Sequence, residues 1–164
     1  MAEIATARNG AQYVTLGLER ETFAVEVEKV REILDMRPVS RIPNAPPFMM
    51  GMIDVRGHSV PVICLRRKLG LPEIPPTEHT RILVLEVAIG DQPRVLGLVA
   101  DRVFEVAALS PADMEAAPDV GTRWRSDYIR AIGRRNGAFV IIFDLDHLFG
   151  CEEAAFIGPA ETAA

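Results

Sequence analysis

Residues 53–65, IDVRGHSVPVICL, hold two apolar runs that flank a short polar turn at Arg56 and Gly57. Apolar and β-branched residues on both sides of a glycine turn are typical of a β-hairpin. Pro61 stands inside the second run and has no backbone N–H, so we expect it on an edge strand or at a bulge. The arms of the hairpin and the helical turn that follows it are predicted at residues 48–55, 58–65 and 66–71.

The same hairpin pattern recurs near the C-terminal end of the chain. In what we call the hairpin alignment, a constant offset superimposes Gly57, Val60, Val62, Leu65 and Gly70 on Gly137, Val140, Ile142, Leu145 and Gly150. In the strand alignment, a smaller offset superimposes Val25, Val30, Glu32 and Ile33 on Leu98, Val103, Glu105 and Val106. Repetition of this kind indicates an internal duplication. The larger offset of the hairpins places the additional residues of the second half in the irregular stretch 110–126.

Further strands are expected where apolar and β-branched runs are bounded by turn residues. They lie at residues 13–18, 22–27, 81–89, 94–100, 128–134 and 138–145. Residues 26–34 instead place apolar side chains at helical spacing, so we predict a short helix there. Residues 101–109 fit a strand or a helix, and the proline-rich segment 71–79 marks a boundary between subdomains.

Two units of about five short strands each predict a mostly all-β protein made of two small barrels, because closure of a sheet removes its open edges. We expect one domain over residues 11–150, with subdomains at about 11–72 and 80–150 and exchange of strands between them left open. Residues 1–10 are expected to be a loose arm, and residues 151–164 a mobile tail.

Composition bounds the class of protein. The chain has 164 residues, 49% hydrophobic and 25% charged, with a net charge of −5 and a pI of about 5.2. This acidity does not favour nucleic acid or anionic lipid as partners. No stretch approaches the roughly 20 apolar residues that span a bilayer. With two cysteines, Cys64 and Cys151, and no secretory signal pattern, the sequence predicts a cytosolic protein.

The candidate chemical groups do not form a recognisable site. The three histidines, His58, His79 and His147, have no metal-ligand spacing with cysteines or carboxylates, so no metal site is predicted. The loop 51–57 lacks the Lys-Ser/Thr ending of a phosphate loop, so no nucleotide or other cofactor is predicted. Cys64 fits a buried, inert thiol better than a nucleophile. Asp144 and Asp146 fit helix capping better than acid/base catalysis.

Two basic clusters leave an alternative open. Arg66, Arg67 and Lys68 form the first, and the stretch from Arg123 to Arg135 mixes arginines with Trp124 and Tyr128. A basic and aromatic stripe can bind single-stranded nucleic acid. Because the chain as a whole is acidic, we favour a solvated surface, with a nucleic-acid-binding β barrel as the alternative.

Segments of this chain, taken in order, resemble the CheW-like family, the scaffold proteins of bacterial chemotaxis. They are YVTLGLERETFAVEVEKVREIL, FMMGMIDVRGHSVPVICLRRKLG, GLVADRVFEVAALSPADME and YIRAIGRRNGAFVIIFDLDHLF. The resemblance covers about residues 12–150. It implies two tandem SH3-like five-stranded β barrels with short connecting helices.

The resemblance also implies a function. Family members are non-catalytic adaptors that couple the cytoplasmic tips of methyl-accepting chemoreceptors to a histidine autokinase, whose regulatory domain has the same fold. A cytoplasmic protein is therefore expected, recruited to membrane-associated receptor arrays without inserting into the membrane. Asp54 and Cys64 stand where the family often has asparagine and aspartate. An adaptor of a paralogous pilus or surface-sensing system is accordingly a second expectation.

Site residues follow from the same resemblance, position by position. Receptor contact is implied for Val30, Glu32, Arg56, Val103 and Val106. Glycines needed for function are implied at Gly51, Gly57 and Gly97, and weaker kinase-side positions are Ile42, Pro43 and Ile53. For the valines the alternative is ordinary core packing, and for Arg56 it is an exposed turn residue.

Overall fold

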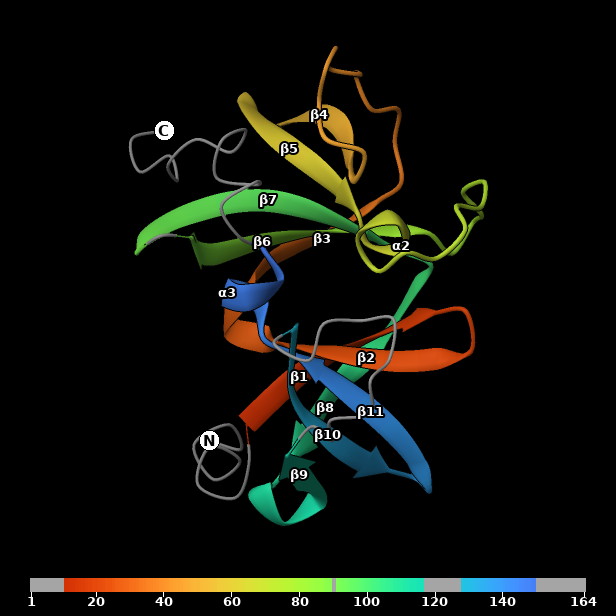
Figure 1. The fold of residues 1–164 in the computed structure, drawn as a ribbon, viewed down its shortest axis with the longest axis vertical. Helices are drawn as coiled ribbons and strands as arrows, with labels where there is room; N and C mark the ends of the chain where they lie inside the picture. Colours follow the sequence, from red (N-terminus) through yellow and green to blue (C-terminus); the bar gives the residue numbers. More distant parts are fainter. Residues whose placement is uncertain (1–10, 90, 117–127, 150–164) are drawn as a thin grey trace.

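Two curled β-sheets lie one above the other in the computed structural model, which describes residues 11–89, 91–116 and 128–149 (Figure 1). The six-stranded sheet has the order β8 (Arg102–Leu109), β1 (Ala11–Leu18), β2 (Glu21–Glu26), β11 (Ala138–Phe143), β10 (Ile129–Arg135) and β9 (Met114–Ala116). The five-stranded sheet has the order β3 (Val30–Asp35), β6 (Arg81–Ile89), β7 (Gln92–Ala100), β5 (His58–Cys64) and β4 (Met49–Val55).

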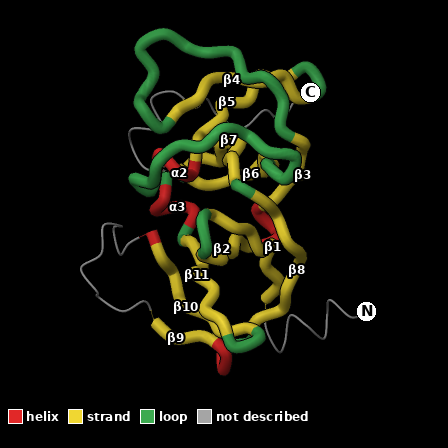
Figure 2. The backbone as a smooth tube through the Cα atoms, turned by 90° about the vertical axis from the view of Figure 1, so that its right-hand side faces the viewer, coloured by secondary structure: helices red, strands yellow, loops and turns green. Residues whose placement is uncertain are grey.

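Short helical turns join or follow the strands. They are η1 (Val27–Lys29), α2 (Leu65–Lys68), η2 (Pro111–Asp113) and α3 (Leu145–Leu148). Figure 2 shows the six-stranded sheet curled into a half-barrel below the five-stranded one. The prediction of a mostly β protein with two small curled units and short connecting helices is confirmed.

The internal duplication is confirmed by the parallel strand pairs. In the five-stranded sheet, Val62 of β5 lies opposite Gly97 of β7. In the six-stranded sheet, Ile142 of β11 lies opposite Ala24 of β2. The hairpin alignment superimposes Val62 on Ile142, and the strand alignment superimposes Ala24 on Gly97. Both sheets therefore place equivalent residues in the same pairing.

The sheets do not follow the predicted division at residues 72–80. Strands β1 and β2 belong to the sheet that contains β8–β11, and strands β6 and β7 belong to the sheet that contains β3–β5. The proline-rich segment separates the two sequence repeats, and each repeat gives its first hairpin to the sheet completed by the other. Each sheet therefore contains strands from both repeats. The arm 1–10 and the tail 151–164 lie outside the described residues.

The helix predicted at residues 26–34 is wrong, because the segment forms η1 and then strand β3. A β-bulge between Val30 and Glu32 adds one residue to β3 relative to β6. Such a bulge turns residues three apart to the same face of a strand. Val30 and Ile33 therefore copy the spacing of a helix. The ambiguous segment 101–109 is strand β8, with a similar bulge opposite β1.

Three apolar clusters lie within the part of the chain that the structure describes. Tyr13, Ala24, Leu109, Val140 and Ile142 pack inside the curl of the six-stranded sheet. Ile53, Val55, Val60, Val62 and Ile82 pack inside the curl of the five-stranded sheet. The largest cluster, which we call the inter-sheet core, takes side chains from both sheets. It includes Val14, Leu16, Phe23, Leu83, Leu85, Leu98 and Phe143, with the rings of Phe23 and Phe143 stacked at 4.9 Å.

The hairpin at residues 49–64 forms as expected, but β5 is not an edge strand. Arg56 and Gly57 have φ of 52° and 86°, the left-handed pair that a tight hairpin turn needs. Pro61 lies opposite Met52, and the N–H of Met52 points away from β5 and donates to Ser40 O at 2.8 Å. Pairing of β5 with β7 begins only at Val62, so the missing N–H of Pro61 interrupts no ladder.

Candidate protein-binding surface

Strands β3 and β8 are outer strands of the two sheets, and the strand alignment relates one to the other. On β3, Val30 lies opposite Leu85. Ile33 lies opposite Leu83, and both leucines belong to the inter-sheet core. Because residues opposite each other in antiparallel strands share a face, Val30 and Ile33 face the region between the sheets.

Strand β8 repeats this arrangement. Val103 lies opposite Leu16. Val106 lies opposite Val14, and both partners again belong to the inter-sheet core. Val103 and Val106 therefore face the same region from the other sheet.

We call Val30, Ile33, Val103 and Val106 the inter-sheet rim. Val30 and Val103 are half-buried and pack against the inter-sheet core. Ile33 is 43% exposed and Val106 is 52% exposed, so both side chains are accessible to a partner. The structure thus packs Val30 and Val103 against one core, and it places Val106 and Ile33 on the same faces of β8 and β3 as these valines. The signal for Ile33 was present, since the strand alignment superimposes it on Val106.

The bulge that positions the β8 half of the rim is held by a buried threonine. The Thr15 hydroxyl donates to the Glu105 carbonyl at 2.8 Å and accepts the Glu105 N–H at 3.2 Å. Thr15 is one of the few buried polar side chains in the described part of the chain. Its hydroxyl satisfies backbone groups that the bulge removes from the ladder.

Glu32 and Arg56 are brought together, but on the other face of β3. Glu32 lies opposite Val84, beyond the bulge, so it points away from the face that carries Val30. The Arg56 guanidinium at the hairpin tip lies 3.2 Å from the Glu32 carboxylate. An exposed pair of this kind contributes about 0–1 kcal/mol to stability. Its main effect is to hold the hairpin tip beside β3.

The predicted glycines have backbone and packing roles. Gly51 has φ of 147°, and a Cβ there would lie 2.0 Å from the carbonyl oxygen of Ser40. Gly57 completes the hairpin turn, where a Cβ would meet open space. At Gly97 a Cβ would lie 3.0 Å from Cγ2 of Ile82. Gly51 and Gly97 therefore allow close approach of other segments inside the five-stranded sheet.

The kinase-side positions differ in accessibility. Ile42 is half-buried and Pro43 is exposed on the loop between β3 and β4. Ile53 is 5% exposed and packs inside the curl of the five-stranded sheet. Its side chain does not reach the surface, so only Ile42 and Pro43 remain available to a partner.

The first basic cluster is not a solvated surface, contrary to the prediction. Arg66 is buried at 5% exposure and bonds to acidic groups. Arg67 donates to both oxygens of Glu73 at 3.1 and 2.8 Å. The ammonium of Lys68 lies over the ring of Phe48 at 4.6 Å. These side chains hold α2 in place.

The second basic cluster does not form an open cationic stripe in its described part. Arg130 contacts Glu26 at 2.8 Å, and Arg135 contacts Glu105 at 2.6 Å. Arg134 lies over an exposed phenylalanine ring at 4.8 Å. Arg123 and Arg125 lie outside the described residues. Carboxylates already hold two of the described arginines, which speaks against the nucleic-acid alternative.

The candidate catalytic groups are buried or engaged in local structural contacts. Cys64 is buried, and burial raises the pKa of its thiol, which disfavours the thiolate. Asp144 precedes α3 as expected, but its carboxylate bonds to His147 at 2.8 Å in place of a backbone cap. Asp146 accepts the Ala88 N–H at 3.1 Å and ties α3 to β6. Within residues 11–89, 91–116 and 128–149, no three metal-ligating side chains converge.

The described part of the chain also holds no helix with the length and apolar character needed to cross a membrane.

Comparison with solved structures defines the class of protein. The scaffolding protein TtCheW from Thermoanaerobacter tengcongensis superimposes with a TM-score of 0.75 at 27% identity, over 85% of this chain and 92% of that one. The chain therefore has the fold of a scaffolding protein.

Sequence comparison then gives the family. The profile of the CheW-like domain matches residues 12–153. The chemotaxis protein CheW of Rhizobium meliloti (strain 1021) is 28% identical over 144 residues, 88% of this chain and 90% of the relative. That of Bacillus subtilis (strain 168) is 29% identical over 155 residues, 94% and 97% of the two chains. The chain belongs to the CheW-like domain family, whose members are non-catalytic scaffolds of chemotaxis.

Proposed function

We propose that this protein is an adaptor that couples the cytoplasmic tips of chemoreceptors to a chemotaxis histidine autokinase. The inter-sheet rim is the observation that carries the proposal. Its four apolar side chains border one core from two sheets, and Ile33 and Val106 are exposed. An apolar strip of this kind suits the apolar face of an amphipathic helix. The receptors that members of this family bind have cytoplasmic tips that are helical hairpins.

In this proposal the Glu32–Arg56 pair sets the direction in which the receptor helix binds. Arg56 is highly exposed at the hairpin tip and keeps donors beyond those that face Glu32. We expect it to meet a receptor carboxylate or helix C-terminal carbonyls. Charged groups at the edge of an interface act mainly on orientation and association rate. Arg56 lies on the face of the outer strand β3 opposite Val30, so in this proposal it selects the direction of a helix that passes the edge of β3, while the rim supplies apolar contact.

The kinase-side contact is assigned to the loop between β3 and β4. Pro43 is exposed there and Ile42 lies beside it, partly buried against the inter-sheet core. This loop belongs wholly to the five-stranded sheet, whereas the inter-sheet rim draws on both sheets. Receptor and kinase would thus occupy separate surfaces of one cytoplasmic protein, which the receptors recruit to the membrane-associated array.

A pair of aspartate substitutions tests the receptor site. We expect Val106→Asp to weaken binding of a soluble receptor-tip fragment by about tenfold or more, because a carboxylate replaces an apolar contact. The matched control is Phe139→Asp, which also changes an exposed apolar residue of the six-stranded sheet, 56% exposed and on β11. Titration calorimetry measures both affinities, and circular dichroism checks that both variants stay folded.

The proposal predicts that the control binds the tip fragment with nearly native affinity. Equal affinities of a folded Val106→Asp variant and the native chain would remove the rim from the receptor site. Loss of binding in both variants would point to a receptor site elsewhere on the six-stranded sheet.

A further inference from the structure

Arg66 is a buried guanidinium at the place where the two sheets meet. It lies in α2, which follows β5 of the five-stranded sheet. Its Nε donates to Asp101 Oδ1 at 2.9 Å, and its Nη2 donates to Asp101 Oδ2 at 2.6 Å. Nη1 donates to Pro72 O at 2.8 Å and also contacts the Glu19 carboxylate. A forked contact of this kind is among the stronger and more directional hydrogen bonds in proteins.

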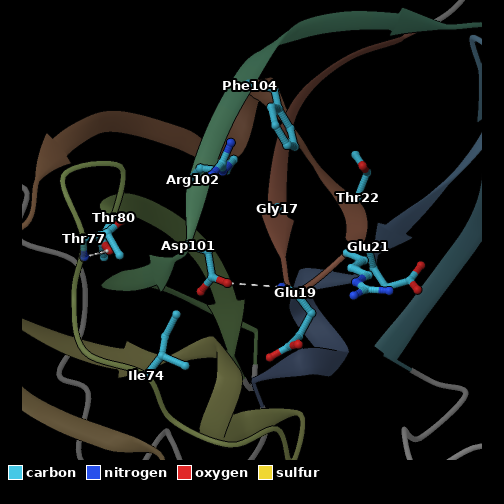
Figure 3. A pocket seen from close by; sticks show the side chains of 11 residues that line it. Gly17, Glu19, Glu21, Thr22, Ile74, Thr77, Thr80, Asp101, Arg102 and Phe104 are labelled. Atoms are coloured by element: carbon cyan, nitrogen blue, oxygen red, sulfur yellow. Dashed lines mark hydrogen bonds between the residues drawn. The ribbon is translucent and has the colours of Figure 1, made fainter.

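The two carboxylate partners of Arg66 belong to the other sheet or lead into it. Glu19 lies in the turn between β1 and β2 of the six-stranded sheet. Asp101 is the residue between β7 and β8, where the chain passes from the five-stranded to the six-stranded sheet. Asp101 Oδ2 also accepts the backbone N–H of Glu19 at 3.1 Å, the bond drawn in Figure 3. We call Arg66, Asp101 and Glu19 the inter-sheet latch.

The latch supplies contacts of fixed direction, which the inter-sheet core does not. Apolar burial holds the sheets together, but it is non-directional and tolerates small rotations of one sheet on the other. A bidentate guanidinium–carboxylate contact has a fixed geometry. A cavity of about 250 Å³ lies beside the latch, lined by Ile74 and Phe104 among others (Figure 3). Side chains do not fill the junction there, so polar contacts carry more of the alignment.

We propose that the inter-sheet latch sets the relative orientation of the two sheets and thereby aligns the two halves of the inter-sheet rim. Asp101 directly precedes β8 and stands two residues before Val103. Glu19 follows β1, which pairs with β8 along its length. The latch therefore fixes the β8 half of the rim against the β3 half. This inference rests on the proposed function, because it assigns the rim to the receptor.

The geometry predicts that loss of the latch affects receptor binding and kinase binding differently. The rim takes Val30 and Ile33 from one sheet and Val103 and Val106 from the other. The kinase-side loop joins two strands of the five-stranded sheet, and Pro43 is exposed on it. A change in the angle between the sheets should therefore weaken receptor binding and leave kinase binding intact. Arg66 and Asp101 act as positioning residues, since neither needs to touch the receptor.

The test replaces the central charges together. Arg66→Met with Asp101→Leu removes the buried guanidinium and its half-buried carboxylate partner together, and replacing both members of such a pair is often neutral or stabilising. The matched control is Arg67→Met with Glu73→Leu. That pair is also forked, at 3.1 and 2.8 Å, and starts from the same helix, but it does not reach the six-stranded sheet. Asp101→Asn is a second latch variant in case the double substitution does not fold.

Two measurements are made on each folded variant. Spin labels at Ser59→Cys on β5 and Ala108→Cys on β8, in a background with Cys64→Ala and Cys151→Ser, report the distance between the sheets by pulsed electron resonance. Both label positions are exposed. Calorimetry on unlabelled protein gives the affinities for a receptor-tip fragment and for the kinase regulatory domain.

We expect the latch variants to shift or broaden the distance distribution and to lower receptor-tip affinity about tenfold. Kinase-domain affinity should stay within about twofold of native, and the control pair should change neither measurement. An unchanged distance distribution in a folded latch variant would overturn the inference, as would equal loss of both partners. If the native chain binds no receptor tip, the proposed function fails, while the distances still decide whether the latch orients the sheets.

Discussion

At the residue scale, two glycines with positive φ have different reasons to be glycine. Gly57 needs only the left-handed backbone of the hairpin turn, and its surroundings are open. Gly51 has φ of 147° and lies against the Ser40 backbone, which bridges to Met52 and brings the loop after β3 onto β4. Backbone conformation limits substitution at the first position, and conformation and space together limit it at the second.

This difference gives a prediction for alanine substitutions. Gly57→Ala should lower the free energy of unfolding by about 1–2 kcal/mol, the cost of a left-handed backbone with a side chain. Gly51→Ala should lower it by about 3 kcal/mol or more, because the new Cβ meets a backbone carbonyl that cannot rotate away. Urea unfolding of both variants measures the two losses. Equal losses would show that the Ser40 contact is not tight in solution.

Sequence reasoning located residues with local signals and missed those whose partners are remote. Gly57 follows from turn chemistry within a few positions. Pro61 was predicted on an edge strand or at a bulge, and that prediction is wrong, because β5 pairs with β4 and, from Val62 onward, with β7. Arg66 carries no such signal, since its partners stand 35 and 47 residues away in sequence. The prediction of a solvated basic cluster was therefore reasonable from composition and wrong in the fold. The receptor and kinase assignments of individual residues stay predictions.

At the element scale, the bulges in β3 and β8 explain the segment that sequence reasoning misread. A bulge puts residues three apart on one face, so the pattern resembles a helix. The short strand β9 within residues 110–116 was missed as well, because three residues give no periodicity to detect. The hairpins were predictable, since their strands are longer and their turns carry glycine.

The bulge of β8 can be tested through Thr15. Thr15→Val removes the hydroxyl that bonds to both backbone groups of Glu105. We expect the free energy of unfolding to fall by about 1–3 kcal/mol, the cost of leaving buried backbone groups unsatisfied. Hydrogen exchange at the Glu105 amide should become faster. Thr22→Val on β2 is the control, since its hydroxyl makes no hydrogen bond within the described residues. Similar losses in the two variants would contradict the assignment.

At the scale of the whole molecule, the sequence repeats and the sheets divide the chain differently. Self-similarity revealed two repeats, but it did not show which sheet receives each first hairpin. That choice depends on contacts between β2 and β11 and between β5 and β7, which are far apart in sequence. The exchange makes each sheet depend on both halves, and the latch lies where the chain crosses between them.

The latch predicts a specific acid sensitivity. Burial alone would raise the pKa of Asp101, but hydrogen bonds from Arg66 and the Glu19 N–H hold it below its usual value. A folded-state pKa below the unfolded one, which is about 3.9, stabilises the fold above that pH. This contribution is lost as the pH falls through the lower folded-state value. We expect Asp101→Asn to be less stable at neutral pH and to lose less stability below about pH 4.

Urea unfolding between neutral pH and the acid limit measures this dependence for the native chain and the variant. Glu73→Gln is the comparison variant. Arg67 also lowers the pKa of the Glu73 carboxyl, but the Arg67–Glu73 pair does not join the two sheets. Parallel acid profiles of the native chain and Asp101→Asn would contradict the role given to Asp101.

Methyl-resolved nuclear magnetic resonance of the full chain tests the central claim most directly. When a receptor-tip fragment is added, we predict that the methyl signals of Val30, Ile33, Val103 and Val106 shift together, across both sheets. When the kinase regulatory domain is added alone, the signals of Ile42 should shift and those of the rim should not. Receptor-induced shifts confined to one sheet would contradict the account, as would shifts that leave both Ile33 and Val106 unmoved.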